Sequence, residues 1–308
     1  MITLLGVTGY VGQKFADALE NSDFSFEGLS RRDLDYTQSD LLEDYLQKKK
    51  PDFVINAAGY TGKPNVEACE QDKANCLAGN GVFPGLLADV CRQLNIPWGH
   101  VSSGCIFTGK RPDGNGFRET DVPNFSFRQN NCSFYSGTKA LGEETLGYGM
   151  DETGESWVPT RAETGYIWRL RIPFNHEATP RNYIAKLLHY DRLLDAENSI
   201  SHLDEFVRAC LECWIKKIPY GIYNVTNPGS ITAKEVVEYI QTSDLGKHLI
   251  AQGKEFKFFK DEAEFMKTTA TTPRSNCVMD SSKLEDAGIH LTPVQEAIQS
   301  ALAHWTER

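Results

Sequence analysis

The chain opens with an apolar run that ends in three evenly spaced glycines, in the segment MITLLGVTGYVG. Gly6, Gly9 and Gly12 lie between this run and a helical pattern, with Tyr10 and Val11 at the turn. Glycines here allow a tight turn, and free N–H groups at a helix start attract a pyrophosphate. The G-x-x-G-x-x-G spacing is weak alone, and a Gly-rich turn without a ligand is the alternative. Its place between strand and helix favours a dinucleotide site.

Short apolar runs and helical patterns alternate through the first half of the chain. The runs cover residues 1–8, 24–30, 51–59 and 96–103, and helical patterns separate them. This β-α-β rhythm predicts a parallel sheet covered on both faces. We expect a Rossmann-like, doubly wound α/β domain in residues 1–171, completed by elements at about 200–225. A smaller mixed domain is expected in residues 172–308.

The second half has a mixed order. A strand at 167–174 follows a helix that begins near Phe134, and helices are expected at 181–194, 203–217 and 232–241. A strand at 221–227 and a closing helix from Pro293 complete the pattern. Residues 147–166 are read as a long excursion, with a hidden hairpin as the alternative.

Composition limits the classes of partner. With 308 residues and 40% hydrophobic residues, the chain can bury a large core. A net charge of -10 without a basic stripe argues against nucleic acid. No stretch reaches the roughly 18 apolar residues of a spanning helix, and the first residues lack the basic start of a signal peptide, so no membrane partner is expected.

The eight cysteines lack the density of a disulfide-stapled secreted scaffold, which favours a reducing, cytoplasmic location. Cys210 and Cys213 share one helix face, and core packing is favoured over metal or redox work there. We therefore predict no metal site.

The second apolar run ends in GLSRRD, where the ribose of a dinucleotide usually meets an acidic residue. Ser30, Arg31 and Arg32 suit a 2'-phosphate instead, so NADPH is the expected cofactor. Asp33 keeps NADH as an alternative, and two solvated surface arginines are the other reading.

The segment SFYSGTKALGEE places Tyr135 and Lys139 four residues apart on one helix face. An ammonium beside a phenol favours phenolate, which would let Tyr135 exchange a proton near neutral pH. Ser103 can hydrogen-bond the same substrate oxygen. A chance pair on a surface helix is the alternative, but a nucleotide fold and an upstream serine favour catalysis.

The sequence resembles extended short-chain dehydrogenases/reductases, and within them the nucleotide-sugar 4-reductases that make deoxysugars. It is most similar to the bifunctional 3,5-epimerase/4-reductases of UDP-L-rhamnose synthesis and to the dTDP-4-dehydrorhamnose reductases. The resemblance covers nearly the whole chain and is carried by NAAGYTGKPNVEACE (56–70), GCIF (104–107), GFRETDVPNF (116–125), FYSGTKA (134–140), PRNYIAK (180–186), YNVTNPG (223–229) and PRSN (273–276).

The resemblance implies that Cys105 is an acid/base in epimerisation, with Lys186 as its partner. A ketone at sugar C4 acidifies the hydrogens at C3 and C5, and a thiol with an ordinary pKa of about 8.5 can exchange such protons. A small buried cysteine and a solvated lysine are the alternatives. Ser103 stands where the most similar relatives have threonine, which keeps the hydroxyl.

The resemblance also implies binding residues. The cofactor would meet Ala57, Ala58, Gly59, Tyr60 and Asn80, besides Tyr135 and Lys139. The nucleotide-sugar substrate would meet Ser103, Gly104, Cys105, Asn182, Lys186, Arg274 and Asn276. A structural ion pair for Arg274 and an inconsequential helix asparagine at position 80 are the alternatives.

We therefore expect an NADPH-dependent enzyme that epimerises and reduces a UDP- or dTDP-linked 4-keto-6-deoxyglucose. A 4-reductase alone is the alternative enzyme, and a non-catalytic regulatory subunit of this fold is the alternative from another class. The resemblance also implies a homodimer formed through the Tyr135 helix.

Overall fold

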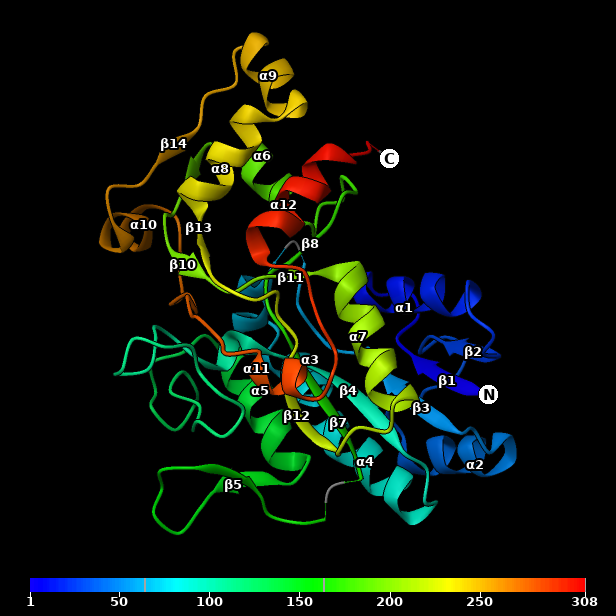
Figure 1. The fold of residues 1–308 in the computed structure, drawn as a ribbon. Coiled ribbons are helices and arrows are strands. Elements are labelled where there is room, and N and C mark those ends of the chain that lie inside the picture. The colour runs from blue at the N-terminus through cyan, green and yellow to red at the C-terminus, as the bar shows by residue number, and fades with distance from the viewer. Residues whose placement is uncertain (64, 163, 308) are drawn as a thin grey trace.

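The computed structural model describes residues 1–63, 65–162 and 164–307. Its centre is a six-stranded parallel sheet in the order β2-β1-β3-β4-β7-β12 (Figure 1). The strands are β1 (Ile2–Leu5), β2 (Phe26–Leu29), β3 (Phe53–Asn56), β4 (Trp98–Ser103), β7 (Gly165–Leu170) and β12 (Gly221–Asn224). The predicted Rossmann-like fold is confirmed.

Helices cover both faces of this sheet, as its continuous apolar strands require. On one face α1 (Tyr10–Glu20) packs against α7 (Leu203–Ile215), and on the other lie α2 (Ser39–Lys49), α4 (Phe83–Gln93) and α5 (Phe134–Thr145). Cys210 and Cys213 are fully buried in the core beneath α7, so their predicted packing role is confirmed.

The strand order reverses between β1 and β3, because β2 lies on one side of β1 and all later strands lie on the other. Open parallel sheets bind ligands at such a switch point, beyond the carboxyl ends of the strands. The segments that follow β1, β3, β4 and β7 therefore meet at one edge, and these segments carry the predicted site residues.

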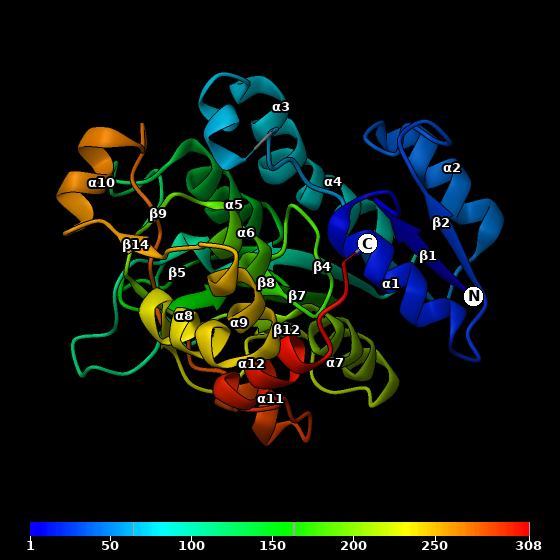
Figure 2. The same cartoon turned by 90° about the horizontal axis from the view of Figure 1, so that it is seen from above.

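A second region has its own core beyond that edge, around Phe174, Ile184, Val236 and Ile298. Figure 2 shows α8, α9 and α12 grouped there, with α10 standing apart. Its elements are β8 (Pro173–Phe174), α6 (Tyr183–His189), β9 (Arg192–Leu193), β10 (Glu197–Asn198), β11 (Ser201–His202), β13 (Ile231–Thr232), α8 (Ala233–Thr242), α9 (Asp244–Ala251), β14 (Lys257–Phe258), α10 (Glu262–Thr268) and α12 (Val294–Ala303). The short helix α11 (Ser282–Asp286) packs against β12 of the central sheet instead, and its Leu284 belongs to that core. The assignment of substrate binding to residues 172–308 stays a prediction.

Two local predictions change in the structure. The helix expected over residues 181–194 ends at His189, because Arg192–Leu193 form β9 and pair with β14 instead. Residues 147–166 contain the alternative hairpin, β5 (Tyr148–Met150) and β6 (Trp157–Pro159), which buries Trp157. Residue 163 in this piece lies outside the described residues.

Within the described ranges, the structure contains no helix that is both long and apolar enough to cross a membrane. All eight cysteines are free thiols.

Candidate functional site

The glycine turn after β1 is packed closely against neighbouring backbone. Gly6 has φ +84°, and a Cβ on Gly12 would lie 2.0 Å from the Gly6 carbonyl oxygen, so neither position tolerates a side chain. Among the described residues, α1 has no side-chain cap, and its first turn holds no acidic residue. Its first N–H groups, at Tyr10 and Val11, are free to bind an anion. These residues fit the pyrophosphate of a dinucleotide.

The turn after β2 is organised by Asp33, whose carboxylate accepts hydrogen bonds from the Ser30 backbone N–H (2.8 Å) and hydroxyl (2.7 Å). These bonds lower the pKa of Asp33. Arg31 and Arg32 are exposed beside it. Their contact with a 2'-phosphate stays a prediction.

The loop after β3 is fixed by two asparagines. Asn56 accepts a hydrogen bond from the Ala58 N–H at 3.0 Å, while Asn80 accepts from the Tyr60 N–H and donates to the Tyr60 carbonyl, both at 2.8 Å. Asn80 is fully buried in a π-helical turn, Ala78–Val82. Such turns are rare and often mark functional sites. Asn80 thus positions the predicted cofactor loop, which sequence reasoning had left open.

Ser103, Tyr135 and Lys139 are brought together where β4 meets α5. Burial raises the pKa of the Tyr135 phenol, and the Ser103 hydroxyl beside it acts in the opposite direction. Lys139 is buried, and its Nζ donates to the Val101 carbonyl at 3.4 Å. The same Nζ lies 3.4 Å from where a Cβ on Gly59 would stand, so the amine faces the predicted cofactor loop.

Burial dominates the titration of this cluster. It raises the pKa of Tyr135 well above its usual value, and the Cys105 thiol next to it acts in the same direction. Burial also lowers the pKa of Lys139. The pKa of Tyr135 therefore shifts away from the phenolate that the sequence pattern favours, because desolvation is the largest effect on it. A neutral phenol is the form that can donate a proton.

Cys105 belongs to the same cluster. It is 6% exposed, and its backbone N–H donates to the Ser103 hydroxyl at 3.3 Å. Burial raises the pKa of the thiol. Gly104 lets this segment pack, because a Cβ there would lie 2.2 Å from the Met279 sulfur. The thiol is thus a buried group that favours its protonated form, beside the predicted catalytic residues.

Lys186 lies on α6 among other cations. Burial lowers the pKa of its amine, and Arg181 and Arg274 lower it further by repulsion. Arg181 donates to the Thr61 hydroxyl at 2.7 Å and to the Gly62 carbonyl at 3.1 Å, so it ties α6 to the loop after β3. The sequence reading missed Arg181, although it stands within the matched stretch PRNYIAK.

The side chains of three predicted substrate-binding residues form hydrogen bonds or ion pairs with other residues of the chain. Arg274 pairs with Glu67 at 2.7 Å, which is the ion pair that the sequence left as an alternative. The buried Asn182 caps α6, and its amide nitrogen donates to Asn175 and to the Glu177 carbonyl. This geometry argues against substrate contact by Asn182, because its side-chain oxygen and nitrogen both make hydrogen bonds within the protein. Asn276 accepts from the Asn198 amide at 3.3 Å.

A buried ion pair, also missed from the sequence, fastens α5 to the sheet. Glu143 accepts two hydrogen bonds from Arg169, at 2.9 and 2.7 Å, and a third from Ser102 at 2.8 Å. Both members of the pair are fully buried. The helix that carries Tyr135 and Lys139 is thereby fixed in register against β4 and β7.

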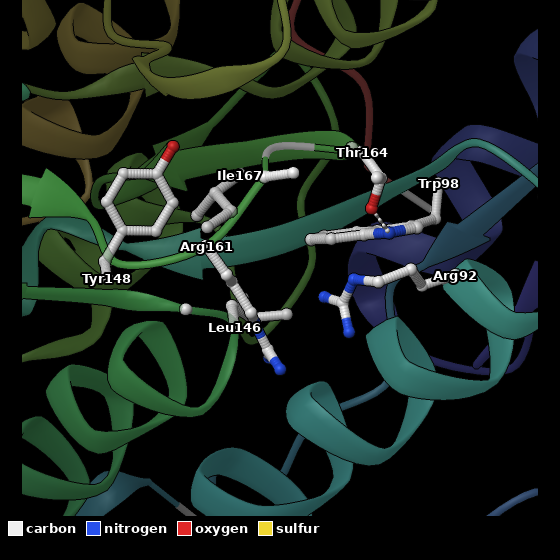
Figure 3. A pocket seen from close by; sticks show the side chains of 10 residues that line it. Arg92, Trp98, Leu146, Tyr148, Arg161, Thr164 and Ile167 are labelled. Carbon is white, nitrogen blue, oxygen red and sulfur yellow. Dashed lines mark hydrogen bonds between the residues drawn. The ribbon is translucent and has the colours of Figure 1, made fainter.

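Figure 3 shows a different pocket, between Trp98, Arg92, Arg161 and Tyr148. It lies at the amino ends of β4 and β7, opposite the edge that holds the catalytic cluster. Trp98 donates to the Thr164 hydroxyl there at 3.2 Å. This pocket is separate from the candidate active site.

Comparison with known families decides the relationship. The family model described as the RmlD substrate binding domain matches residues 1–190, which is more than half of the chain. The chain belongs to the RmlD family. The resemblance predicted from the motifs is therefore confirmed.

The RmlD-family relatives include two proteins of Arabidopsis thaliana, each 32% identical over 96% of this chain. One is a trifunctional UDP-glucose 4,6-dehydratase/UDP-4-keto-6-deoxy-D-glucose 3,5-epimerase/UDP-4-keto-L-rhamnose-reductase, and the chain spans 40% of its length. The other is a bifunctional dTDP-4-dehydrorhamnose 3,5-epimerase/dTDP-4-dehydrorhamnose reductase, and the chain spans 90% of it.

Solved structures share the whole fold. The L780 UDP-rhamnose synthase of Acanthamoeba polyphaga mimivirus superposes with a TM-score of 0.83 at 22% identity, covering 99% of both chains. The dTDP-4-dehydrorhamnose reductase of Bacillus anthracis, in complex with NADP, superposes with a TM-score of 0.75 at 17% identity, covering 99% of this chain and 97% of that one.

Proposed function

We propose that this chain epimerises C3 and C5 of a nucleotide-linked 4-keto-6-deoxyglucose and then reduces C4 with NADPH, giving a nucleotide-linked L-rhamnose. One observation carries the proposal: Cys105, whose backbone N–H donates to the Ser103 hydroxyl at 3.3 Å, lies beside Tyr135, because the Cys105 thiol and Ser103 both act on the pKa of that phenol. A proton carrier for carbon and a proton carrier for the carbonyl oxygen therefore share one site.

The enzyme class is narrower in choice than the nucleotide of the substrate. The chain is an NADPH-dependent oxidoreductase of the RmlD family, as the sequence predicted. UDP-linked and dTDP-linked activities both occur among the names of its relatives, so both nucleotides belong in the tests.

For the reduction, bound NADPH supplies the hydride that C4 receives. Tyr135 donates its phenolic proton to the C4 oxygen, and burial keeps that proton in place until the oxygen becomes basic. Ser103 hydrogen-bonds the same oxygen and orients it. The Lys139 amine, between the catalytic helix and the loop at Gly59, stabilises the phenolate that this transfer leaves behind.

For the epimerisation, the polarised C4 ketone makes the hydrogens at C3 and C5 acidic. Inversion needs a base on one face of the sugar and an acid on the other. The lowered pKa of Lys186 favours a neutral amine that can remove a proton. The raised pKa of Cys105 favours a thiol that can return one. We assign the base to Lys186 and the acid to Cys105.

The Cys105→Ala variant tests this division of roles. The recovered sugar is weighed by mass spectrometry after incubation with the 4-keto substrate in heavy water without NADPH. We expect loss of deuterium uptake at C3, C5 or both, while a substrate that is already epimerised is still reduced near the parent rate. Cys105→Ser should do little better, since an alcohol is a far weaker acid.

Parent-rate exchange at both carbons in Cys105→Ala would leave the thiol as packing. The chain would then be a 4-reductase that acts on a sugar epimerised elsewhere. Loss of both exchange and NADPH binding would instead indicate a folding defect, so cofactor binding is measured by fluorescence on each variant.

A further inference from the structure

Arg171 follows β7 at the same edge of the sheet and is 6% exposed. Its Nη2 donates to the Asn198 side chain at 2.5 Å and to the Ser275 carbonyl. Its Nε is buried and has no hydrogen-bond partner among the described residues. Within those residues, Arg171 also makes no ion pair with a carboxylate.

A buried guanidinium without a carboxylate is costly. Taking an ion out of water costs several kcal/mol, which a protein normally offsets with a counter-charge. Arg169, two residues earlier, shows the ordinary solution, since Glu143 neutralises it with two hydrogen bonds. The partners of Arg171, the Asn198 side chain and the Ser275 carbonyl, are neutral. They accept hydrogen bonds from the guanidinium but do not neutralise its positive charge. This contrast points to a negative charge that appears beside Arg171 only during turnover.

The group that can supply this charge is the Cys105 thiol. Arg171 acts electrostatically on Cys105, and its Cδ lies 3.4 Å from where a Cβ on Gly104, the preceding residue, would stand. Arg171 also acts on Tyr183, which lies one helical turn before Lys186 on α6. The guanidinium therefore acts electrostatically on the loop of the thiol and on the helix of the proposed base.

The other groups around the thiol come from every packed element. Ser103 precedes it, Tyr135, Ser136 and Lys139 face it from α5, and Cys132 lies before that helix. Arg171 and Lys139 are cations that act on the thiol, and the Glu70 carboxylate lies at the start of α5, where it accepts a hydrogen bond from the Phe134 N–H at 2.6 Å. Lys139 donates to the Val101 carbonyl and faces the predicted cofactor loop, whereas Arg171 donates to Asn198 and to the Ser275 carbonyl.

We propose that Arg171 is a positioning residue for Cys105, whose guanidinium holds the negative charge that the thiol acquires when it gives its proton to the substrate carbon. The inference deepens the proposed epimerase function and rests on it. In the step, the S–H bond breaks as a C–H bond forms at the enolate carbon, leaving a thiolate. The proton removed from the opposite face resides on Lys186, and solvent returns the pair to its starting charges.

The backbone around Arg171 is fixed for this task. Its N–H donates to the Ser201 hydroxyl at 3.1 Å, and its carbonyl accepts from the Ser201 N–H at 2.8 Å. The next residue, Ile172, has φ +36°, which is rare for a β-branched residue and costs on the order of 1–3 kcal/mol. Strain of this kind persists where the surroundings hold a residue in one arrangement.

The test is the pH dependence of iodoacetamide alkylation at Cys105, followed by peptide mass spectrometry so that the other seven cysteines do not interfere. Only thiolate reacts, so the rate reports the thiolate fraction without substrate or turnover. We expect Arg171→Met to shift the profile to higher pH and to slow the reaction at fixed pH by about tenfold or more. Arg171→Lys should keep most of the parent profile, because it keeps the charge. Arg118→Met, an exposed arginine that pairs with Asp280, is the control that should change nothing.

An unchanged profile in a folded Arg171→Met protein would overturn the inference. A second comparison leaves Arg171 in place, in case that variant does not fold. Cys105→Asp and Cys105→Asn, which differ in charge and hardly in shape, are compared in a Lys139→Met background by urea unfolding at pH 7. With Arg171 as the counter-charge, the Asp variant should be at least as stable as the Asn variant, and a clearly less stable Asp variant would contradict the assignment.

These readouts separate the inference from the proposed function. An alkaline shift in Arg171→Met, together with parent-rate deuterium exchange in Cys105→Ala, would keep the charge pairing but refute epimerisation by the thiol. Loss of exchange in Cys105→Ala, together with an unchanged alkylation profile in Arg171→Met, would keep the function and refute the role of Arg171.

Discussion

At the scale of residues, burial shifts the pKa values of the proposed proton carriers in opposite directions. It raises the pKa values of Tyr135 and Cys105, which keeps both protonated, and it lowers the pKa of Lys186. Donors and base are thus set by desolvation rather than by the local sequence pattern. In the proposed mechanism, Tyr135 exchanges a proton with the C4 oxygen, whereas Cys105 and Lys186 exchange protons with C3 and C5.

The Tyr135→Phe variant tests the oxygen donor. We expect NADPH oxidation with the 4-keto substrate to fall by about 100-fold or more, because general acid catalysis typically contributes 10²–10⁴-fold. The ring that packs at the start of α5 is kept, so NADPH binding should persist. Deuterium exchange by this variant should also persist in part, and substantial turnover would refute the assignment of Tyr135.

The local motifs were readable from the sequence because their meaning depends on short spacings. Gly6 to Gly12 and Tyr135 to Lys139 each lie within one turn or one helix, and the structure places both where the strand pattern predicted. Arg171, Arg181 and Glu143 were not readable, because each acts through a partner 26 or more residues away, such as Ser275, Thr61 and Arg169. The direction of the Tyr135 pKa shift depends on burial, which spacing does not reveal.

At the scale of elements, α5 is held by charge as well as by packing. Glu143 on its inner face pairs with Arg169 in full burial, whereas Glu144, the next residue, pairs with Arg128 near the surface. The two ion pairs have similar geometry and different surroundings. Their stability contributions should differ because desolvation differs.

We therefore predict that Glu143→Gln lowers the free energy of unfolding by about 3–5 kcal/mol, since it leaves Arg169 buried without a counter-charge. Glu144→Gln is the matched control and should cost less than about 1 kcal/mol, because its pair is solvent-screened. Urea denaturation followed by circular dichroism measures both. Equal losses in the two variants would refute the proposed anchoring of α5.

Elements set by long-range pairing were the hardest to predict. The apolar spacing of residues 181–194 suits one helix, yet Arg192 and Leu193 pair with Lys257 and Phe258 in β14. Strand pairing with a segment about 65 residues away therefore overrode the local helix propensity of Arg192 and Leu193. The spacing of apolar residues within one segment does not indicate such a distant partner. The central strands were easier, because each is a continuous apolar run followed by a helix pattern.

At the scale of the whole molecule, the proposed site draws its residues from both regions. Tyr135 and Cys105 come from the sheet region, whereas Lys186 comes from α6, and Arg181 bridges the two through Thr61 and Gly62. Arg181 also repels a proton on Lys186. The predicted homodimer through α5 stays a prediction, and gel filtration with light scattering would test it.

Removing the Arg181 charge should raise the pKa of Lys186. At a given pH less of the amine would then be neutral, so deuterium exchange should slow, and the acidic limb of its pH profile should move to higher pH. We predict this shift for Arg181→Met, with Arg128→Met as the exposed control. Reduction of an already epimerised substrate should lack this limb, and an unmoved limb in Arg181→Met would contradict the role of Lys186 as the base.

The central claim is that one site performs both epimerisation and reduction. Incubating the protein with NADPH and either UDP- or dTDP-4-keto-6-deoxyglucose, and identifying the sugar by NMR, tests it most directly. The account predicts nucleotide-linked L-rhamnose with one NADPH consumed per sugar. A product reduced at C4 but not inverted at C3 and C5, or no reaction unless a separate epimerase is added, would contradict it.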